Sequence, residues 1–378
     1  MLKRVYVNNY RCLVNFECCL GARHLILGGN GSGKSTLFEV LALVRDVCIR
    51  GDPPKRDPPL TCFVGCSRTR WQEQSEQSFE FDVSGNGGDY QFRLVVDEWG
   101  SPEQPRIVRE EVTFSGNPIF RFEMGEVHLF NDRYEDKVQY PFDCYRSALA
   151  TIAERRDNTK LTWFKNWLGG LLLVSPDPRR MSGVAASEVK NPDQYLSNFA
   201  DWFRHLRQET DDHEYLKDLR DVMEGFDGMR LEDAGERRRE IKVRMGFSEV
   251  GKPSQPPTEY LLSELSEGQR VLIGLYGALH FALKPGATLC FDEPDNFIAL
   301  REVQPWLSKV LEHTEDDAFG SQVLIASHHP EILNSMAFHE GLLLYRPGGR
   351  HTRIKRFDDP SNTGLSAAEL VTRGWERD

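Results

Sequence analysis

The sequence predicts an α/β protein in which a parallel sheet is joined by an antiparallel β layer and a helical insertion. Three observations lead to this prediction: a strand, a glycine-rich turn and a helix near the start, alternating strands over residues 78–130, and helices that alternate with apolar strands after residue 257. At 378 residues the chain exceeds a typical domain of about 150 residues, so it forms two domains or one domain with insertions. We expect one domain over residues 1–378.

The first 50 residues are expected to form short strands followed by a helix. The apolar run Leu25-Ile26-Leu27 ends a strand, and a glycine-rich turn leads into an apolar helix from about Lys34 to Val47. Residues 78–130 are expected to be antiparallel, because polar and apolar residues alternate over 79–83 and 90–94 on both sides of a turn at 84–89.

The hydrophobic period becomes helical over residues 142–225, which we expect to form a helical lid. Apolar residues recur at helical spacing in two stripes, Trp163, Phe164, Trp167, Leu168 and Leu171, and Leu196, Phe199, Trp202, Phe203 and Leu206. Such stripes are more typical of a core face than of a cofactor site. After the Gly- and Pro-rich segment 251–257, helices alternate with apolar strands, which indicates a parallel sheet.

Composition and charge restrict the classes of partner. Hydrophobic residues make up 39% and charged residues 28%, as in soluble globular proteins, and the start lacks the apolar stretch of a signal peptide. No apolar run reaches the roughly 18 residues of a membrane helix, so we expect a cytoplasmic protein without a membrane partner. The net charge of −11 excludes binding of nucleic acid by the whole surface and leaves a local basic patch.

The eight cysteines show neither disulfide-framework nor zinc-site spacing. Cys18 and Cys19 are adjacent, and the pair Cys62 and Cys66 has no second pair nearby. We expect reduced, structural thiols.

The segment Gly28-Gly29-Asn30-Gly31-Ser32-Gly33-Lys34-Ser35 fits the phosphate-binding pattern G-x₄-G-K-[ST]. It lies between a predicted strand and a predicted helix, where glycines let backbone N–H groups face the phosphates and the helix N-terminus favours an anion. In this pattern the lysine reaches the β- and γ-phosphates and the following hydroxyl binds Mg²⁺. We therefore expect ATP and Mg²⁺ as ligands of Gly28, Asn30, Gly31, Ser32, Gly33, Lys34, Ser35 and Thr36.

Two carboxylates follow the apolar run 287–291. Asp292 and Glu293 would lie at the carboxyl end of a buried strand, where α/β proteins bind their ligands. Such a pair alone is more often a helix cap or a solvated pair. Beside a phosphate loop, we expect Asp292 to hold Mg²⁺ and Glu293 to orient or deprotonate the attacking water.

Two further segments each have a structural and a functional interpretation. Ser266 and Gln269 form a capping box before the helix 271–283, but a serine hydroxyl and Gly268 at a helix N-terminus also suit a phosphate. His328 follows a predicted strand and precedes Pro330, which can begin the next helix. It either caps that helix or donates a hydrogen bond to the γ-phosphate.

The order of these motifs resembles that of the ABC-type ATPases, in the SMC/RecF/OLD-like branch with AAA_21-like AAA-family ATPases. The resemblance covers about the first 50 residues and residues 260–345, and the opening 7–11 favours this branch over transporter subunits. It implies a P-loop NTPase head with Lys34 in the Walker A loop, 265–269 as the signature, Asp292 and Glu293 as Walker B and catalytic glutamate, and His328 as the switch histidine. It also implies a nucleotide contact by Arg11, a D-loop from Asp295, and a Q-loop glutamine that is either Gln72 or Gln77.

The resemblance also implies a mechanism. In this family the signature contacts ATP bound by the opposite subunit, so a homodimer should close around two Mg·ATP and reopen on hydrolysis. Glu267 replaces the glycine usual in transporter signatures. We expect no coiled-coil arms in the short stretch from Lys34 to Ser266 and no nuclease domain in the residues after His328.

The resemblance therefore implies an ATPase that controls a separate, nuclease-like effector in DNA-related anti-phage defence or repair. The alternative is the nucleotide-binding subunit of an ABC transporter. Any DNA contact would come from one of two basic clusters, each equally compatible with a solvated strand face or turn: Arg237, Arg238, Arg239, Lys242 and Arg244, or Arg346, Arg350, Arg353, Lys355 and Arg356.

Overall fold

The computed structural model describes residues 1–50, 63, 67–98, 105–235, 237–246, 256–315, 320–358 and 364–374. Its centre is a six-stranded sheet in the order β10 (Leu171–Val174), β15 (Thr288–Asp292), β16 (Gln322–Ala326), β3 (Arg23–Leu27), β17 (Gly341–Tyr345) and β18 (Arg353–Arg356). The first five strands are parallel and β18 is antiparallel to β17. The inner strands are buried almost throughout, as expected for a parallel sheet covered on both faces.

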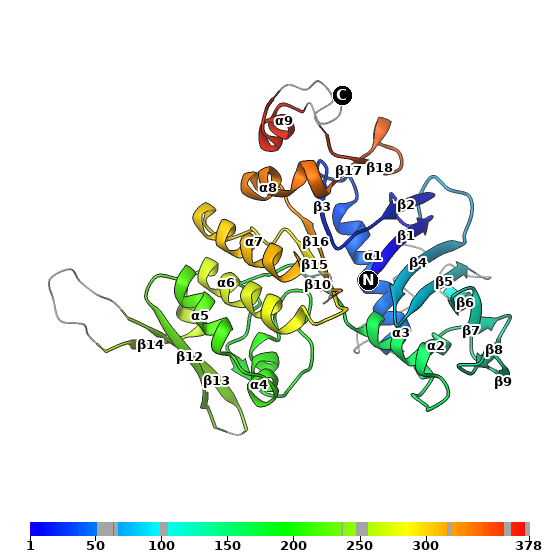
Figure 1. Cartoon of the computed structure of the whole chain (residues 1–378), viewed down its shortest axis with the longest axis horizontal. Coiled ribbons are helices and arrows are strands. Elements are labelled where there is room, and N and C mark those ends of the chain that lie inside the picture. Colours follow the sequence, from blue (N-terminus) through cyan, green and yellow to red (C-terminus); the bar gives the residue numbers. More distant parts are fainter. Residues whose placement is uncertain are drawn as a thin grey trace.

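An eight-stranded antiparallel sheet lies beside it, to the right in Figure 1. Its order is β2 (Phe16–Cys19), β1 (Leu2–Asn8), β4 (Gln77–Gly85), β5 (Gly88–Glu98), β6 (Pro105–Phe114), β7 (Asn117–Glu123), β8 (Glu126–Phe130) and β9 (Asp136–Pro141). The expected hairpin is present, with Phe81 opposite Phe92 and Ser84 opposite Asp89. The antiparallel layer is larger than the predicted 78–130, because β1, β2 and β9 join its ends.

The phosphate-loop helix α1 (Lys34–Arg50) packs between these two sheets. One core cluster contains the buried α1 residues, residues of the antiparallel sheet such as Phe81, and Ile26 and Cys290 of the central sheet. Helices α2 (Ala148–Thr151) and α3 (Thr159–Gly169) contact α1. The loop that precedes α1 is therefore supported by rigid elements on two sides.

A second core cluster covers the other face of the central sheet. It contains α4 (Phe199–Glu209), α5 (His213–Val222), α6 (Glu267–Gly277), the π-helix Ala278–Ala282, α7 (Leu300–Glu315), α8 (Pro330–Glu340) and α9 (Ala367–Arg373). A small sheet extends this side, with β11 (Val184–Ala185), β13 (Arg239–Met245) and β12 (Phe226–Asp233) in order and β14 (Thr258–Leu261) on β13 (Figure 1). Two 3₁₀ turns span Leu262–Glu264 and Pro347–Gly349.

The segment 142–225, predicted to be a helical lid, contains strands as well as helices. Leu171, expected on a helical stripe, begins β10, which pairs with β15 as the edge strand of the central sheet. A short apolar run cannot be assigned to helix or strand from its period, and Gly169-Gly170 ends α3 just before it. Leu196 lies before α4 with φ of +57°, whereas Phe199, Trp202, Phe203 and Leu206 form the buried face of α4 as expected.

Gln322 at the start of β16 joins the two large sheets. Its side chain is fully buried and its amide N–H groups donate to the carbonyl oxygens of Leu2 and Gly21, both at 2.7 Å. Its Oε1 accepts from the Leu2 N–H at 3.0 Å and the Thr288 hydroxyl at 2.9 Å. One side chain thus fixes β1 against β15 and β16.

Among the described helices, none combines the length and apolar character needed to cross a bilayer. The described cysteines Cys12, Cys18, Cys19, Cys48, Cys144 and Cys290 are free thiols, and Cys62 and Cys66 lie outside the described residues.

Candidate nucleotide site

The loop from Gly28 to Lys34 connects β3 to α1, and its glycines are required by its backbone. A Cβ on Gly28 (φ +144°) would lie 2.2 Å from the Leu344 carbonyl oxygen, and one on Gly33 (φ +109°) 2.9 Å from the Thr352 hydroxyl. Gly31 has φ of +75° and open space around its Cβ position. The Ser32 hydroxyl is buried and has no hydrogen-bond partner in the part of the chain that the structure describes, so the loop presents an unused donor of the kind a phosphate would accept from.

Lys34 is the first residue of α1 and its side chain is buried. Its ammonium donates to the Gly28 carbonyl oxygen at 2.7 Å and to the His328 Nε2 at 2.8 Å. Burial lowers the pKa of Lys34, and the carboxylates of Glu293 and Asp292 oppose this. Burial and the Lys34 charge lower the pKa of His328, which agrees with a neutral imidazole accepting at Nε2. The structure therefore brings these two predicted site residues into contact, although they are almost 300 positions apart in sequence.

Ser35 and Asp292 form a second contact between the predicted motifs. The Ser35 hydroxyl donates to the Asp292 carboxylate at 3.3 Å, and burial raises the pKa of Asp292 while this bond lowers it. A hydroxyl and a carboxylate on adjacent elements are the oxygen ligands that Mg²⁺ prefers. These two residues fit a magnesium ion. Thr36, the next residue of α1, is partly exposed beside them.

Glu293 follows β15 in a left-handed conformation, with φ of +50°. Its N–H donates to the Ala326 carbonyl oxygen at 2.8 Å, and its carboxylate accepts from the Asn296 amide at 2.9 Å. Asp295 accepts from the Ser327 hydroxyl at 2.6 Å. A non-glycine residue in this conformation persists only where its surroundings fix it, and such residues concentrate at functional sites. The turn after β15 is thus tied to the residues just before His328.

The predicted signature begins α6 and lies apart from the phosphate loop. The Ser266 hydroxyl accepts from the Gln269 N–H at 3.3 Å and the Gln269 side chain accepts from the Ser266 N–H at 3.0 Å, so the capping box forms. A Cβ on Gly268 would lie 2.9 Å from the Phe297 carbonyl oxygen. No hydrogen bond within the described residues links Ser266, Gly268 or Gln269 to the loop 28–35.

Comparison with known proteins identifies the family. A family model described as "AAA domain, putative AbiEii toxin, Type IV TA system" matches residues 24–334, which is most of the chain. The chain belongs to this AAA_21 family. No curated protein matches it.

Solved structures resemble the AAA_21 chain in fold. An SMC head bound to the C-winged helix domain of ScpA has a TM-score of 0.54 and 11% identity, with 98% of this chain and 99% of that chain covered. The SMC head domain from Thermotoga maritima has a TM-score of 0.45 and 12% identity over 95% and 99% of the chains. The first likeness confirms an SMC-head-like P-loop fold.

Arg11, Gln72 and Gln77, which the family resemblance suggested as nucleotide-site residues, differ in burial and in hydrogen-bond partners. Arg11 (φ +48°) pairs with Glu39 of α1, and its N–H donates to the Ser67 carbonyl oxygen at 2.6 Å. Gln77 is fully buried and donates to the Asn9 carbonyl oxygen at 2.8 Å, so it belongs to the core. Gln72 is partly exposed in the loop before β4.

Arg346 lies beside the phosphate loop and Trp71 lies beside Arg346, a neighbourhood that the sequence did not predict for this loop. Arg346 donates to the Gly31 carbonyl oxygen at 3.2 Å, and its guanidinium lies 5.9 Å from the centre of the Trp71 ring, which is 47% exposed. A cavity of about 500 Å³ extends from residues 29–32 to Arg346 and Pro347. Trp71 gives no sequence signal, because it is a single residue outside any periodic segment.

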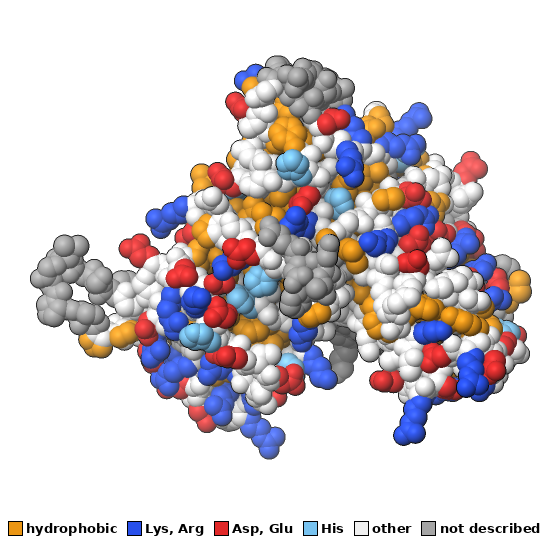
Figure 2. Space-filling model, viewed as in Figure 1, with side chains coloured by type: hydrophobic (Ala, Val, Ile, Leu, Met, Phe, Trp, Pro, Cys, Tyr) orange, Lys and Arg blue, Asp and Glu red, His pale blue; other side chains and the backbone are white. Residues whose placement is uncertain are grey.

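The two predicted DNA clusters do not form continuous basic surfaces. Lys242 pairs with Glu240 at 3.1 Å and Arg244 with Asp227 at 3.1 Å, while Arg239 lines a small cavity with Arg204, Arg207 and Arg230. Arg346 and Arg350 lie near the phosphate loop, whereas Lys355 and Arg356 belong to a different cavity. Figure 2 shows Lys and Arg interspersed with Asp and Glu over the visible face.

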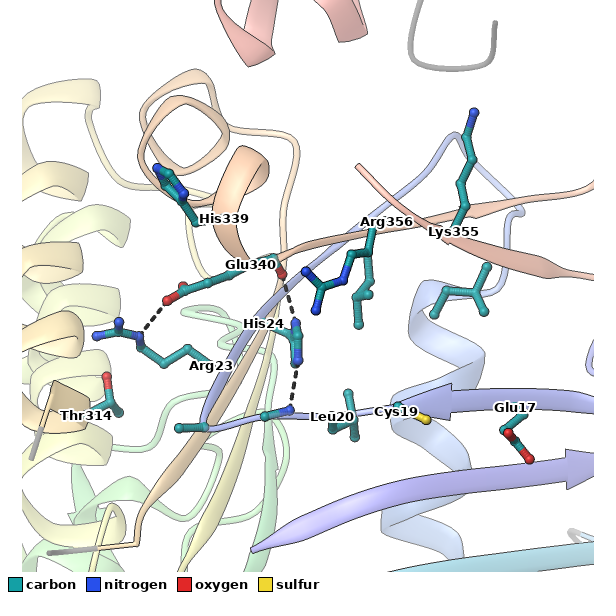
Figure 3. A pocket seen from close by; sticks show the side chains of 14 residues that line it. Glu17, Cys19, Leu20, Arg23, His24, Thr314, His339, Glu340, Lys355 and Arg356 are labelled. Carbon is teal, nitrogen blue, oxygen red and sulfur yellow. Dashed lines mark hydrogen bonds and ion pairs between the residues drawn. The ribbon is translucent and has the colours of Figure 1, made fainter. Parts of the chain in front are cut away.

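That second cavity, of about 760 Å³, lies at the opposite edge of the central sheet from the phosphate loop. Figure 3 shows Arg23 directed at Glu340, a 2.8 Å ion pair, and His24 held from both sides. His24 Nε2 accepts from the Gly21 N–H at 2.8 Å, so Nδ1 carries the proton toward the Glu340 carbonyl oxygen at 2.9 Å. The Arg23 and His24 side chains are paired, while Glu340 Oε2 is buried with no hydrogen-bond partner among the described residues, and the nucleotide site lies at the other edge.

Proposed function

We propose that this AAA_21 chain binds Mg·ATP and hydrolyses it. The observation that carries the proposal is the convergence of Lys34, Ser35, Asp292, Glu293 and His328, from three neighbouring strands, at the carboxyl edge of one parallel sheet. This edge is where α/β proteins bind ligands, and phosphoryl transfer needs positioned charge more than covalent chemistry.

Each residue has a role that its position supports. Backbone N–H groups of the loop 28–33 and the Lys34 ammonium bind the phosphates, with the unpartnered Ser32 hydroxyl as a further donor. Ser35 and Asp292 hold Mg²⁺, which when bound neutralises phosphate charge. Glu293 orients or deprotonates the attacking water, and we assign His328, which contacts Lys34, to the γ-phosphate.

We propose further that hydrolysis takes place in a homodimer whose signature completes the site of the opposite subunit. Phe297, whose carbonyl oxygen lies beside Gly268, is 41% exposed, and Leu300, the first residue of α7, is 65% exposed. Burial of these two large apolar side chains between subunits would remove them from water, which favours association. A second head that closes over Ser266 and Phe297 would cover them.

The biological proposal is control of a separate effector in anti-phage defence or DNA repair. The family description names the AbiEii toxin and a type IV toxin–antitoxin system, which supports defence over repair. In the SMC head structure a winged-helix domain of another protein is bound, which supports a protein partner for this head-like fold as well. No observation favours the alternative of an ABC-transporter subunit. A permease gene beside the gene for this chain would be evidence for that alternative.

Lys34→Ala tests ATP binding and hydrolysis. We expect loss of phosphate release in a coupled assay, because the substitution removes the buried ammonium between Gly28 and His328. Lys217→Ala, at an exposed lysine of α5, is the matched control and should retain full activity. Equal turnover by both variants, with unchanged circular dichroism, would contradict the proposal.

Glu293→Gln tests the composite dimer. We expect it to bind Mg·ATP but not to hydrolyse it, so that ATP converts the variant to a dimer in light scattering coupled to size exclusion. Adding Ser266→Arg should prevent this by steric and charge conflict, while Ser335→Arg at an exposed position of α8 should not. If the untreated protein is already a dimer, cross-linking near Ser266 replaces size as the measurement. A variant that binds ATP with neither change would exclude the composite site.

A further inference from the structure

A cavity of about 280 Å³ lies between α3, α4 and the π-helix Ala278–Ala282, at the amino ends of β10 and β15. Leu172 of β10 and Ala287, directly before β15, are on its wall. Asp292 is at the other end of β15, so this cavity is separate from the nucleotide site. Figure 1 shows α3 and α4 in different halves of the molecule, so the cavity lies where those halves meet.

The walls of this cavity are aromatic. Trp163, Trp167, Trp202 and Phe281 line it, and they come from three helical segments. Trp and Phe rings supply large flat apolar surfaces that stack on other rings. Four of them around one small space favour a ligand with one or two aromatic rings, since the volume is slightly below the roughly 300 Å³ of the smallest drug-sized sites.

The rings are held in place by contacts with one another and with rings outside the cavity. Trp163 stacks on Tyr90 of β5 with ring centres 4.9 Å apart and planes at 15°. Trp202 meets Phe281 edge to face at 6.3 Å, and Phe281 meets Tyr215 at 5.0 Å. A ligand would find these walls already formed, which reduces the entropy cost of binding.

The rim of the cavity is positively charged. Lys190 and Lys284 both line it, both are exposed, and neither forms an ion pair with a described residue. No carboxylate is among the described residues that line the cavity. The Asn166 side chain, exposed on α3, adds an amide to the same rim. In a chain with a net charge of −11, this local excess of positive charge favours an anionic ligand.

The π-helix adds a second reason to regard this wall as functional. Phe281 and Ala282 belong to it, and it directly continues α6. Single π turns inside helices are uncommon and are frequent at functional sites. We infer that this cavity is a binding site for a small aromatic anion, a flat one- or two-ring molecule with a carboxylate or sulfonate that faces Lys190 and Lys284. The inference does not depend on the proposed ATPase activity.

Isothermal titration calorimetry with 1-naphthoate tests the site on the full chain without nucleotide. We expect one site per chain with a Kd of about 0.1–1 mM, in the range usual for a ligand of this size. The neutral 1-naphthalenemethanol should bind about tenfold more weakly, because it keeps the rings and loses the charge. Equal affinity for both, or no saturable binding of 1-naphthoate up to 5 mM, would overturn the inference.

Variants locate the binding in the cavity. Lys190→Gln with Lys284→Gln should weaken 1-naphthoate about tenfold and leave 1-naphthalenemethanol unchanged, while Lys137→Gln with Lys217→Gln, at exposed lysines elsewhere, should change neither. Asn166→Trp should fill the entrance and abolish binding, and Asn166→Ala should preserve it. Unchanged circular dichroism and urea midpoints serve as the folding check. Binding that survives both the lysine pair and Asn166→Trp would place the ligand elsewhere and refute the site.

Discussion

Replacing Gln322 by Leu should weaken the joint between the two sheets by about 3 kcal/mol. The substitution removes four hydrogen bonds, to the Leu2 N–H, the Leu2 and Gly21 carbonyl oxygens and the Thr288 hydroxyl. Leaving a buried polar group unpaired costs about 1 kcal/mol or more, so the four partners together lose about 4 kcal/mol. The apolar leucine regains about 1 kcal/mol through burial of its methyl groups.

Urea unfolding followed by tryptophan fluorescence and circular dichroism measures this loss. Thr288→Val is the matched control, because it removes one of the four bonds and should cost about 1 kcal/mol. Coincident transitions by the two probes are needed before the free energies of unfolding are compared. If Gln322→Leu costs no more than Thr288→Val, the polar cluster does not hold the sheets together and the reasoning is refuted.

Three further results are expected. Because burial and Lys34 lower the pKa of His328 from its ordinary 6.5, the unfolded chain takes up this proton first, so wild-type stability should fall as pH drops below about 6.5. His328→Gln should lose less stability between pH 7 and pH 5 in urea unfolding, and an equal loss would contradict the assignment. Trp71→Ala should raise the Kd for ATP about two- to tenfold in a fluorescent-nucleotide titration without changing kcat, if the ring beside Arg346 stacks on the base. If DNA binds, replacing Arg237, Arg238 and Arg239 together by Ala should weaken a salt-sensitive mobility shift, and an unaffected shift would exclude this surface.

The local parts of the candidate site could be predicted from the sequence because each is contiguous. The segment from Gly28 to Ser35 needs glycine at turns that only a few consecutive residues create, and the structure places positive φ at Gly28, Gly31 and Gly33. The capping box at Ser266 is equally local, since its two hydrogen bonds join residues three apart. The hairpin at 84–89 follows from alternation on both sides of a turn.

Features that depend on contacts between residues distant in sequence could not be predicted from the sequence. The run from Leu171 to Val174 is a strand because β15 offers it an open edge, and its own period does not distinguish strand from helix. Gln77 is a core residue because its amide donates to the Asn9 carbonyl oxygen and the Ser67 hydroxyl. These partners are distant in sequence, so the sequence around Gln77 does not predict its burial. The sequence also could not predict that the basic cluster at 237–244 is paired with carboxylates. Lys242 forms an ion pair with Glu240, and Arg244 forms one with Asp227 of another strand.

The phosphate loop, the acidic strand end and the alternation that produces a parallel sheet are encoded locally, because they depend on near neighbours in the chain. The adjacency of β3, β16 and β15 depends on the folded structure. That order brings Lys34 to His328 and Ser35 to Asp292, at 2.8 and 3.3 Å, and places Trp71 beside Arg346. Strand order depends on the packing of α1 between two sheets and on polar joints such as Gln322, and these are contacts between residues hundreds of positions apart.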